Sequence, residues 1–185
     1  MGIKLFILIT ASIVLIIIII ALIVVLKKGP KLKKIIKNKK DLGELLEITY
    51  SNSGDSNGNT DFVSLDIKRM TVTTEYRTTY SDPLKIKEYR VDNIDKILEY
   101  INNYNIPGWS ILPINTDIIA LDAPIKSIIF CYKKDEKIEY YNIDFNMVIE
   151  PFGRDILNDF VKEFLLLKKK DNLIKEYTKE EWWKD

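Results

Sequence analysis

The chain has 185 residues and a formal charge of +1, which results from 28 basic and 27 acidic side chains. These charges are separated along the sequence: residues 1–40 contain nine basic residues and no acidic one, which leaves 19 basic and 27 acidic residues in the rest. Such an asymmetry indicates that the basic part contacts a membrane or another polyanion. Because there is no histidine and only one cysteine, Cys131, the composition excludes a Ser-His-Asp triad, a Cys/His zinc site and an internal disulfide.

Residues 5–26 form an uncharged run of 22 residues in which isoleucine, leucine and valine predominate. As a helix this run is about 33 Å long, which matches a hydrocarbon core of about 30 Å. A core helix of a soluble protein is rarely this long without a charge, and a cleaved signal peptide has a shorter apolar region that ends in small residues. We therefore expect one transmembrane helix at 5–26, preceded by a short tail at 1–4.

The juxtamembrane segment 27–40 carries eight lysines, against one lysine and the α-amino group before the expected span. Because the lysine-rich side usually stays in the cytoplasm, we expect a cytoplasmic domain; an extracytoplasmic one is the alternative, since long domains can be translocated regardless of charge. The spacing of Leu32, Ile35 and Ile36 predicts a short helix in the headgroup region, with a solvated linker as the alternative. The lysines expected at the anionic leaflet are Lys27, Lys28, Lys31, Lys33, Lys34, Lys37, Lys39 and Lys40.

Extended segments come first in the rest of the chain. Alternating apolar and polar residues predict strands around Ile48, Val63 and Val72, the last one long and rich in threonine and tyrosine. A turn at Asp82 leads to a fourth strand at 86–91. Four extended segments with short connections predict an antiparallel meander.

Two helices and a hairpin are expected after the meander. Asp92 is expected to cap a helix that ends before Pro107. Residues 125–132 and 137–145 flank a polar turn and predict a β-hairpin, and a last helix follows Pro151. The residues expected on the inner faces of the two helices are Ile94, Ile97, Leu98, Ile101, Ile156, Leu157, Phe160, Phe164 and Leu167.

Together these elements predict an α+β fold. A transmembrane helix is followed by one domain with an antiparallel sheet of about six strands and two to three helices on one face. Residues 41–170 are expected to form this domain, and residues 171–185 a C-terminal tail that can be helical. The domain is long enough to bury a core without metals or disulfides.

Oxygen-bearing side chains alternate in the loop between the first two strands, at Asp55, Asn57, Asn59 and Asp61. This spacing is that of a calcium loop of the EF-hand kind. The sixth position, however, is Thr60 where an EF-hand requires glycine, and the flanking segments are strands rather than helices. We therefore expect a hairpin loop built from turn-forming residues, without a metal.

Asp122 is the acid in the most apolar setting of the domain, which makes it the best candidate for a catalytic acid with a shifted pKa. A turn acid bonded to the backbone is the alternative that we favour. Cys131 lies beside an apolar run and is expected to be a buried, inert thiol, because no histidine can activate it. No glycine-rich phosphate loop follows a strand and the domain is acidic, so we expect neither a cofactor nor nucleic-acid binding.

Trp182 and Trp183 are adjacent near the C-terminus. Indole side chains are amphipathic and are frequent in protein interfaces and at membrane surfaces. The pair is a candidate for binding a partner; the favoured alternative is that both rings pack against the sheet, because terminal segments with large apolar side chains are usually tied down.

Several short motifs follow one another in the chain: Tyr50, Ser51, Ser53 and residues 54–58 in an early turn, then Trp109, Leu121, Asp122, Ala123 and Pro124, and finally Pro151, Phe152 and Gly153. In this order the chain resembles a loose family of uncharacterised bacterial lipoproteins and membrane-anchored proteins, over most of residues 44–168. It departs from the family in the early turn, where the family tends to show a run of glycines followed by methionine. The resemblance implies the α+β fold and membrane anchoring but no activity, and many such relatives are expected outside the cell.

The leading hypothesis is a single-pass membrane protein whose domain is a non-catalytic binding or assembly module. A membrane-tethered enzyme that uses carboxylate, lysine or tyrosine chemistry is the second hypothesis, with Asp122 as its centre. The third is a scaffold that contacts anionic lipid through residues 27–40. The identity of a protein partner does not follow from the sequence.

Overall fold

The computed structural model describes residues 31–37, 39–53, 60–79, 81–112, 125–148 and 150–179. The chain divides into two compact units, Met1–Asn38 and Lys39–Asp185. In the first unit, helix α2 (Lys31–Lys37) occupies the segment where the spacing of apolar residues predicts a short helix. None of the described helices is long and apolar enough to cross a bilayer, and the span expected at 5–26 lies outside the described residues.

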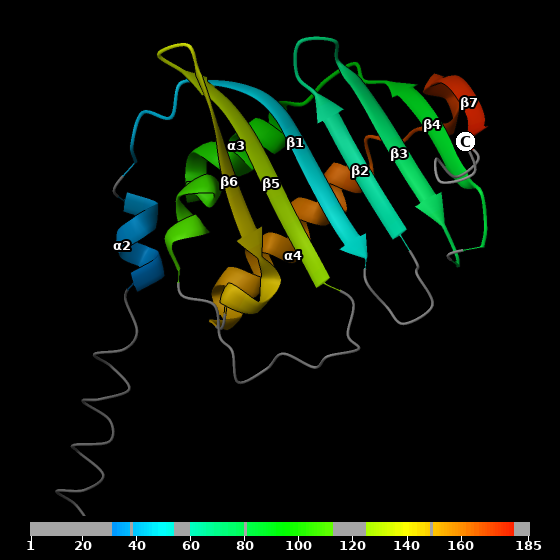
Figure 1. Cartoon of the computed structure of the whole chain (residues 1–185). Helices are drawn as coiled ribbons and strands as arrows, with labels where there is room; N and C mark the ends of the chain where they lie inside the picture. Colours follow the sequence, from blue (N-terminus) through cyan, green and yellow to red (C-terminus); the bar gives the residue numbers. More distant parts are fainter. Residues whose placement is uncertain are drawn as a thin grey trace, which may run out of the picture. The chain divides into compact units, whose positions relative to one another are not determined.

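The second unit contains a seven-stranded antiparallel sheet with the strand order β6-β5-β1-β2-β3-β4-β7 (Figure 1). Strands β1 to β4 pair with their neighbours in sequence, which confirms the predicted meander. The predicted hairpin is β5 and β6, and β5 pairs with β1 on the other side. The strands are β1 (Glu44–Ser53), β2 (Thr60–Asp66), β3 (Thr71–Arg77), β4 (Leu84–Arg90), β5 (Ile125–Lys134), β6 (Lys137–Asp144) and β7 (Leu173–Lys179).

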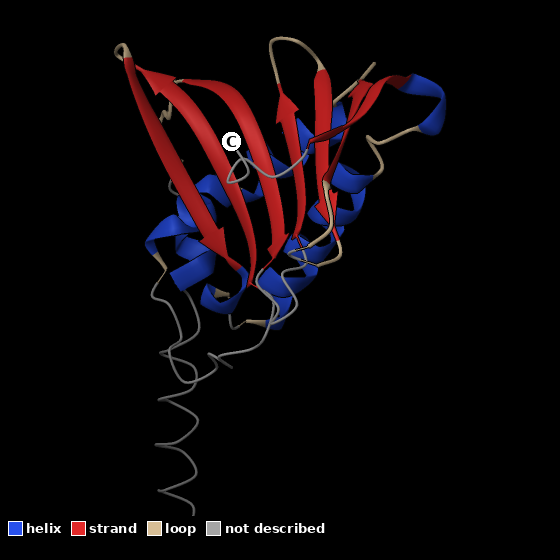
Figure 2. Cartoon of the chain, turned by 45° about the vertical axis from the view of Figure 1, so that its right-hand side comes forward, coloured by secondary structure: helices blue, strands red, loops and turns tan. Residues whose placement is uncertain are grey.

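Helices α3 (Asp95–Tyr104) and α4 (Pro151–Leu165) lie on one face of this sheet, as Figures 1 and 2 both show. Short 3₁₀ helices η1 (Ile106–Ile111), η3 (Phe145–Met147) and η4 (Lys170–Asn172) connect the larger elements. The predicted α+β class and antiparallel sheet are therefore confirmed.

The core of the second unit lies between the sheet and the two helices. Phe160 of α4 stacks on Phe164 at 6.0 Å and meets Phe130 of β5 at 5.9 Å between ring centroids. The indole Nε1 of the buried Trp109 donates a hydrogen bond to the carbonyl oxygen of Tyr104 at 2.9 Å, which satisfies its polar atom. The largest fully buried side chains of this unit are those of Trp109, Phe130, Phe160, Phe164, Ile48, Leu65, Ile97, Ile106, Ile128, Ile143 and Leu157.

The two-residue turn between β5 and β6 places both Asp135 (φ 48°) and Glu136 (φ 62°) in the left-handed region. Two positive φ angles are the geometry of a type I′ turn, whose twist matches that of the flanking strands. The side chains of Lys133 and Glu136 form an ion pair at 2.9 Å across this turn. The hairpin register is therefore fixed at its tip.

Three details of the sequence prediction are wrong. Asp92 does not cap α3: the Asp95 amide donates to Asn93 Oδ1 at 2.6 Å instead, and the Asp92 carboxylate accepts from Asn172 Nδ2 at 3.1 Å. Residues 173–179 are not part of a tail but form β7, the seventh strand, because β4 offers them an edge to pair with. Leu167 lies beyond the end of α4 rather than on its inner face.

Candidate binding surface

The sheet face turned away from α3 and α4 is covered by no other helix or strand within the described ranges (Figure 2), and we call it the open face. Phe130 points toward α4, so its neighbours Ile129 and Cys131 point to the open face. Strand register then gives three rows of side chains across this face. The first row is Thr71, Asp66, Glu47, Cys131 and Tyr140; the second is Glu88, Thr73, Ser64, Thr49, Ile129 and Asn142; the third is Ile86, Glu75, Phe62, Ser51, Ser127 and Asp144.

Carboxylates outnumber basic side chains in these three rows of the open face. The first row ends at Arg90, which pairs with Thr71, and the second ends at Lys175, which pairs with Glu88. Against these two basic groups the three rows carry five carboxylates, whereas the same register places Arg77, Lys133 and Lys179 at the edges of this face, with Glu44 beside Lys133. The three rows, rather than the whole face, are therefore suited to a partner with an excess of basic groups. The carboxylates are those of Glu47, Asp66, Glu75, Glu88 and Asp144.

A cluster of polar side chains around Glu47 occupies the middle of the open face. Glu47 Oε1 accepts hydrogen bonds from the hydroxyls of Ser64 and Thr49, the second at 3.1 Å. The two hydroxyl oxygens lie 3.5 Å apart, because Thr49 and Ser64 are directly paired across β1 and β2. We call these three residues the Glu47 cluster. Two hydroxyls hold an exposed carboxylate in place, and its remaining lone pairs can accept hydrogen bonds from a basic partner.

Cys131 lies opposite Glu47 on β5, and Tyr140 lies opposite Cys131 on β6. Burial raises the pKa of the Cys131 thiol, and the nearby Glu47 charge raises it further, although a hydrogen bond with the Tyr140 side chain acts in the opposite direction. The thiol is therefore protonated at neutral pH and is a poor nucleophile. The expected buried free cysteine is confirmed.

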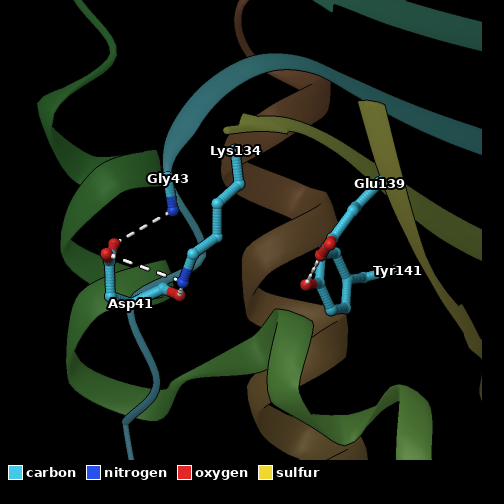
Figure 3. A network of polar contacts seen from close by, with 5 residues as sticks. All are labelled: Asp41, Gly43, Lys134, Glu139 and Tyr141. Carbon is cyan, nitrogen blue, oxygen red and sulfur yellow. Dashed lines mark hydrogen bonds and ion pairs between the residues drawn. The ribbon is translucent and has the colours of Figure 1, made fainter. Parts of the chain in front are cut away.

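Two tyrosines on the helix-covered side of the β5–β6 hairpin have strongly raised pKa values. Burial, followed by the neighbouring Tyr141, raises the pKa of Tyr132 to about 12. A hydrogen bond that the Tyr141 hydroxyl donates to Glu139, followed by burial, raises the pKa of Tyr141 to about 12 (Figure 3). Both phenols thus stay protonated near neutral pH, where they can donate hydrogen bonds but cannot act as bases.

A hollow of about 240 Å³ lies on the outer surface of α3 and α4. Lys96 Nζ approaches Glu163 Oε2 to 3.4 Å there, and Asn103 donates to Glu99 at 3.4 Å. Burial and then the Asp159 and Glu163 charges raise the pKa of Tyr100. The hollow thus already contains an ion pair and a hydrogen-bonded amide, and its groups are those of an ordinary polar surface groove.

The domain begins with a clamp between Asp41 and the end of β5 (Figure 3). Lys134 Nζ donates to the backbone carbonyl of Asp41 at 2.6 Å and lies 3.7 Å from its carboxylate, which also accepts from the Gly43 amide at 3.0 Å. Gly43 has φ +87°, and a Cβ there would lie 2.3 Å from the carbonyl oxygen of Lys133. Only glycine allows the chain to pass this close to the hairpin, so the first residues of the domain are fixed to it.

Most of the catalytic and metal-binding residues predicted from the sequence lie outside the described residues. Asp122 lies outside the described residues, as do three members of the calcium-like loop, Asp55, Asn57 and Asn59. The fourth member, Asp61, is on β2 with its side chain on the helix-covered side, where its charge adds to the burial that raises the pKa of Tyr50. Among the described residues there is no group of three or more potential metal ligands.

The predicted membrane-surface lysines are divided between the two units. Lys31, Lys33, Lys34 and Lys37 belong to α2, and Lys39 and Lys40 are exposed just before the Asp41 clamp. Lys27 and Lys28 lie outside the described residues, and so do Trp182 and Trp183.

Sequence reasoning missed both the Glu47 cluster and the Asp41 clamp. The alternation of Glu47 and Thr49 on the polar face of β1 was a visible signal, but Ser64 and Lys134 enter only through strand pairing. Comparison with known proteins adds no further residue to either site. No family model matches the chain, and neither the curated proteins nor the solved structures include a match, so the family resemblance noted from the sequence stays a prediction.

Proposed function

We propose that the chain is a single-pass membrane protein whose α+β domain is a non-catalytic binding or assembly module, and that a protein partner binds its open face. The observation that carries this proposal is the Glu47 cluster, in which an exposed carboxylate is held by two hydroxyls on the open face. Preorganised polar groups on a rigid sheet reduce the conformational entropy that binding must overcome. A sheet is therefore a good support for a recognition surface.

The membrane part of the proposal rests on the uncharged run at 5–26, which has the length of one span. The lysines at 27–40 favour a cytoplasmic domain under the positive-inside rule. Protease treatment of intact cells tests this orientation, because a cytoplasmic domain is protected until the membrane is opened. Cleavage of the domain in intact cells would place it on the other side.

Charge and polarity of the open face define the kind of partner. The three rows carry five carboxylates, and Arg90 and Lys175 lie at the ends of the first two rows. Most other side chains in the rows are hydroxyls, amides or aromatic rings. We expect a partner surface with excess lysine or arginine, joined through a polar and hydrated interface. Because such contacts are screened by salt, association should slow as ionic strength rises.

The chemistry of the described reactive groups supports binding rather than catalysis. The Cys131 thiol has a raised pKa, and the Tyr132 and Tyr141 phenols have pKa values of about 12, so all three are protonated in the neutral range. None of them is poised as a nucleophile or a general base at that pH. The alternative enzyme hypothesis rests on Asp122 alone, outside the described residues.

Paired substitutions of exposed glutamates test the binding surface. Glu47→Gln removes a charge from the open face, and Glu99→Gln removes one from the outer surface of α3. With full-length protein purified from membranes in mild detergent, we expect Glu47→Gln to reduce the amount of co-purifying partner about tenfold, since a charged hydrogen bond contributes about 1.5 kcal/mol or more. Glu99→Gln should leave it unchanged. Equal recovery with both variants would contradict the proposed surface.

A further inference from the structure

The chain joins the domain at one end of the sheet, which we call the hairpin end. This end contains the Asp41 clamp and the β5–β6 turn (Figure 3), together with the β2–β3 turn, the C-terminal end of β4 and the start of β7. In Figure 1 these connections lie together along the upper edge of the sheet. Because Lys134 fixes Asp41, the juxtamembrane segment reaches the domain at this end and at no other.

The length of the juxtamembrane segment limits how far the hairpin end can lie from a bilayer. If the proposed span ends at residue 26, residues 27–40 form the whole connection. Seven of these residues are in α2, which rises about 1.5 Å per residue, and the others extend at most about 3.4 Å each. Asp41 must then stay within about 35 Å of the end of the span.

Basic side chains gather at three points along the hairpin end. Lys137 lies beside the β5–β6 turn, Lys68 lies in the β2–β3 turn, and the run 168–170 precedes β7. Seven strands at about 4.8 Å spacing separate the first and last of these points by about 29 Å. Three charged points spread over this width can hold the whole end of a sheet against a flat anionic surface.

The two ends of the sheet differ in charge. Residues 39–44, 66–71, 90–92, 133–137 and 168–173 at the hairpin end contain 11 basic and seven acidic side chains. Three of the acids are in ion pairs: Asp66 with Arg69, Glu136 with Lys133, and Asp41 with Lys134. The described residues of the opposite end, 60–61, 76–79, 81–85, 125–127, 143–148, 150–155 and 178–179, contain five basic and five acidic side chains.

We propose that the hairpin end docks on the anionic leaflet, so that the strands point away from the membrane. The inference rests on the proposed membrane span, which keeps the domain near the surface. Each lysine that reaches an anionic leaflet raises the docked population about fivefold, and the excess at this end therefore suffices for a tethered domain. Docking in this way carries the open face upright beside the lipid and leaves its three rows accessible to a partner from the aqueous side.

A fluorescence experiment on the full chain in lipid nanodiscs tests the docked orientation. In a Cys131→Ala background, Leu166→Cys places a bimane label two residues before the lysine run 168–170 of the hairpin end, and Ser81→Cys places one in the β3–β4 turn at the opposite end. Both replaced side chains are neutral and exposed. In nanodiscs with about one-third phosphatidylglycerol, we expect a headgroup nitroxide to quench the label at 166 at least threefold more than the label at 81. In pure phosphatidylcholine or in high salt the two should become similar.

Two sets of lysine substitutions supply the matched control. Lys168→Gln, Lys169→Gln and Lys170→Gln together should abolish the difference between the two labels. Lys85→Gln, Lys126→Gln and Lys179→Gln, which remove the same charge from the opposite end, should preserve it. Equal quenching at both positions in anionic nanodiscs, or equal effects of the two triple variants, would overturn the docking proposal. Release of the chain from native membranes by alkaline carbonate would instead contradict the membrane span.

Discussion

Replacement of Gly43 by alanine tests how the domain begins. The residue has φ +87°, where a Cβ is strained, and the added Cβ would lie 2.3 Å from the Lys133 carbonyl oxygen and 3.0 Å from Lys134 Cβ. Both contacted atoms belong to the backbone of β5 or lie directly beside it, so Lys133 and Lys134 cannot relieve the clash by changing a side-chain rotamer. The chain must move away from the hairpin, which would break the Asp41 clamp.

The expected loss of stability has two parts. Holding alanine at positive φ costs about 1 kcal/mol, and overpacking against backbone costs about 1–3 kcal/mol. Alanine also restricts the unfolded chain, which offsets these terms by about 0.5 kcal/mol. We therefore expect Gly43→Ala to lower the free energy of unfolding by about 1.5–3.5 kcal/mol.

Urea unfolding of the full-length protein in mild detergent, followed by circular dichroism, measures this change. Lys134→Met is the matched control, because it keeps the apolar stem and removes only the exposed ion pair and one hydrogen bond, for a loss of about 1 kcal/mol. If the free energy of unfolding of Gly43→Ala lies within about 0.5 kcal/mol of that of the unsubstituted protein, the close approach of Gly43 to the Lys133 carbonyl does not require glycine. A larger loss for Lys134→Met than for Gly43→Ala would contradict that requirement as well.

Other substitutions and titrations test the core, the hairpin and the reactive groups. Phe160→Ala should lower the free energy of unfolding by about 3–5 kcal/mol in the same urea assay, because the ring is fully buried; a loss below about 1 kcal/mol would contradict its place in the core. Glu136→Gly should be more stable than Glu136→Gln by about 0.5–1 kcal/mol, since both variants lose the ion pair with Lys133 and only glycine adopts φ 62° without strain; equal stabilities would argue against the type I′ turn. Tyr132 and Tyr141 should ionise near pH 12 in an absorbance titration. Because this folded pKa exceeds the unfolded value near 10, their stabilisation is complete below pH 10 and is lost between about pH 10 and 12, and loss of stability below pH 9 would not come from them. Cys131 should resist iodoacetamide at pH 7 until the protein is unfolded, whereas rapid alkylation of the native protein would contradict its burial.

Local periodicity explains why part of the fold follows from the sequence. Strands β1 to β3, the β5–β6 hairpin and the inner faces of α3 and α4 each bury one set of residues at a period of 2 or 3.6, so their patterns are visible within a few residues. Strand β7 has no such pattern, because all seven of its residues are exposed. Its place in the sheet depends on pairing with β4, a contact between distant parts of the chain.

The candidate binding surface depends on long-range register for the same reason. Glu47 and Thr49 alternate on β1, but only pairing with β2 brings Ser64 to them. A shift in register between Leu45 and Glu47 also sets Cys131 opposite Glu47. Periodicity predicts which side of a strand is polar, but it does not give the partner across the sheet, so the Glu47 cluster could not be assembled from the sequence.

The claim that the open face binds the partner is tested most directly by site-specific photocrosslinking in intact membranes. A photoreactive amino acid is placed either at Asn142 on the open face or at Asn103 on the outer surface of α3, two exposed asparagines on opposite sides of the domain. We predict one discrete crosslinked protein from position 142 that is lost when Glu47→Gln is added, and no such product from position 103. The same product from both positions, or a product from position 103 alone, would contradict the account.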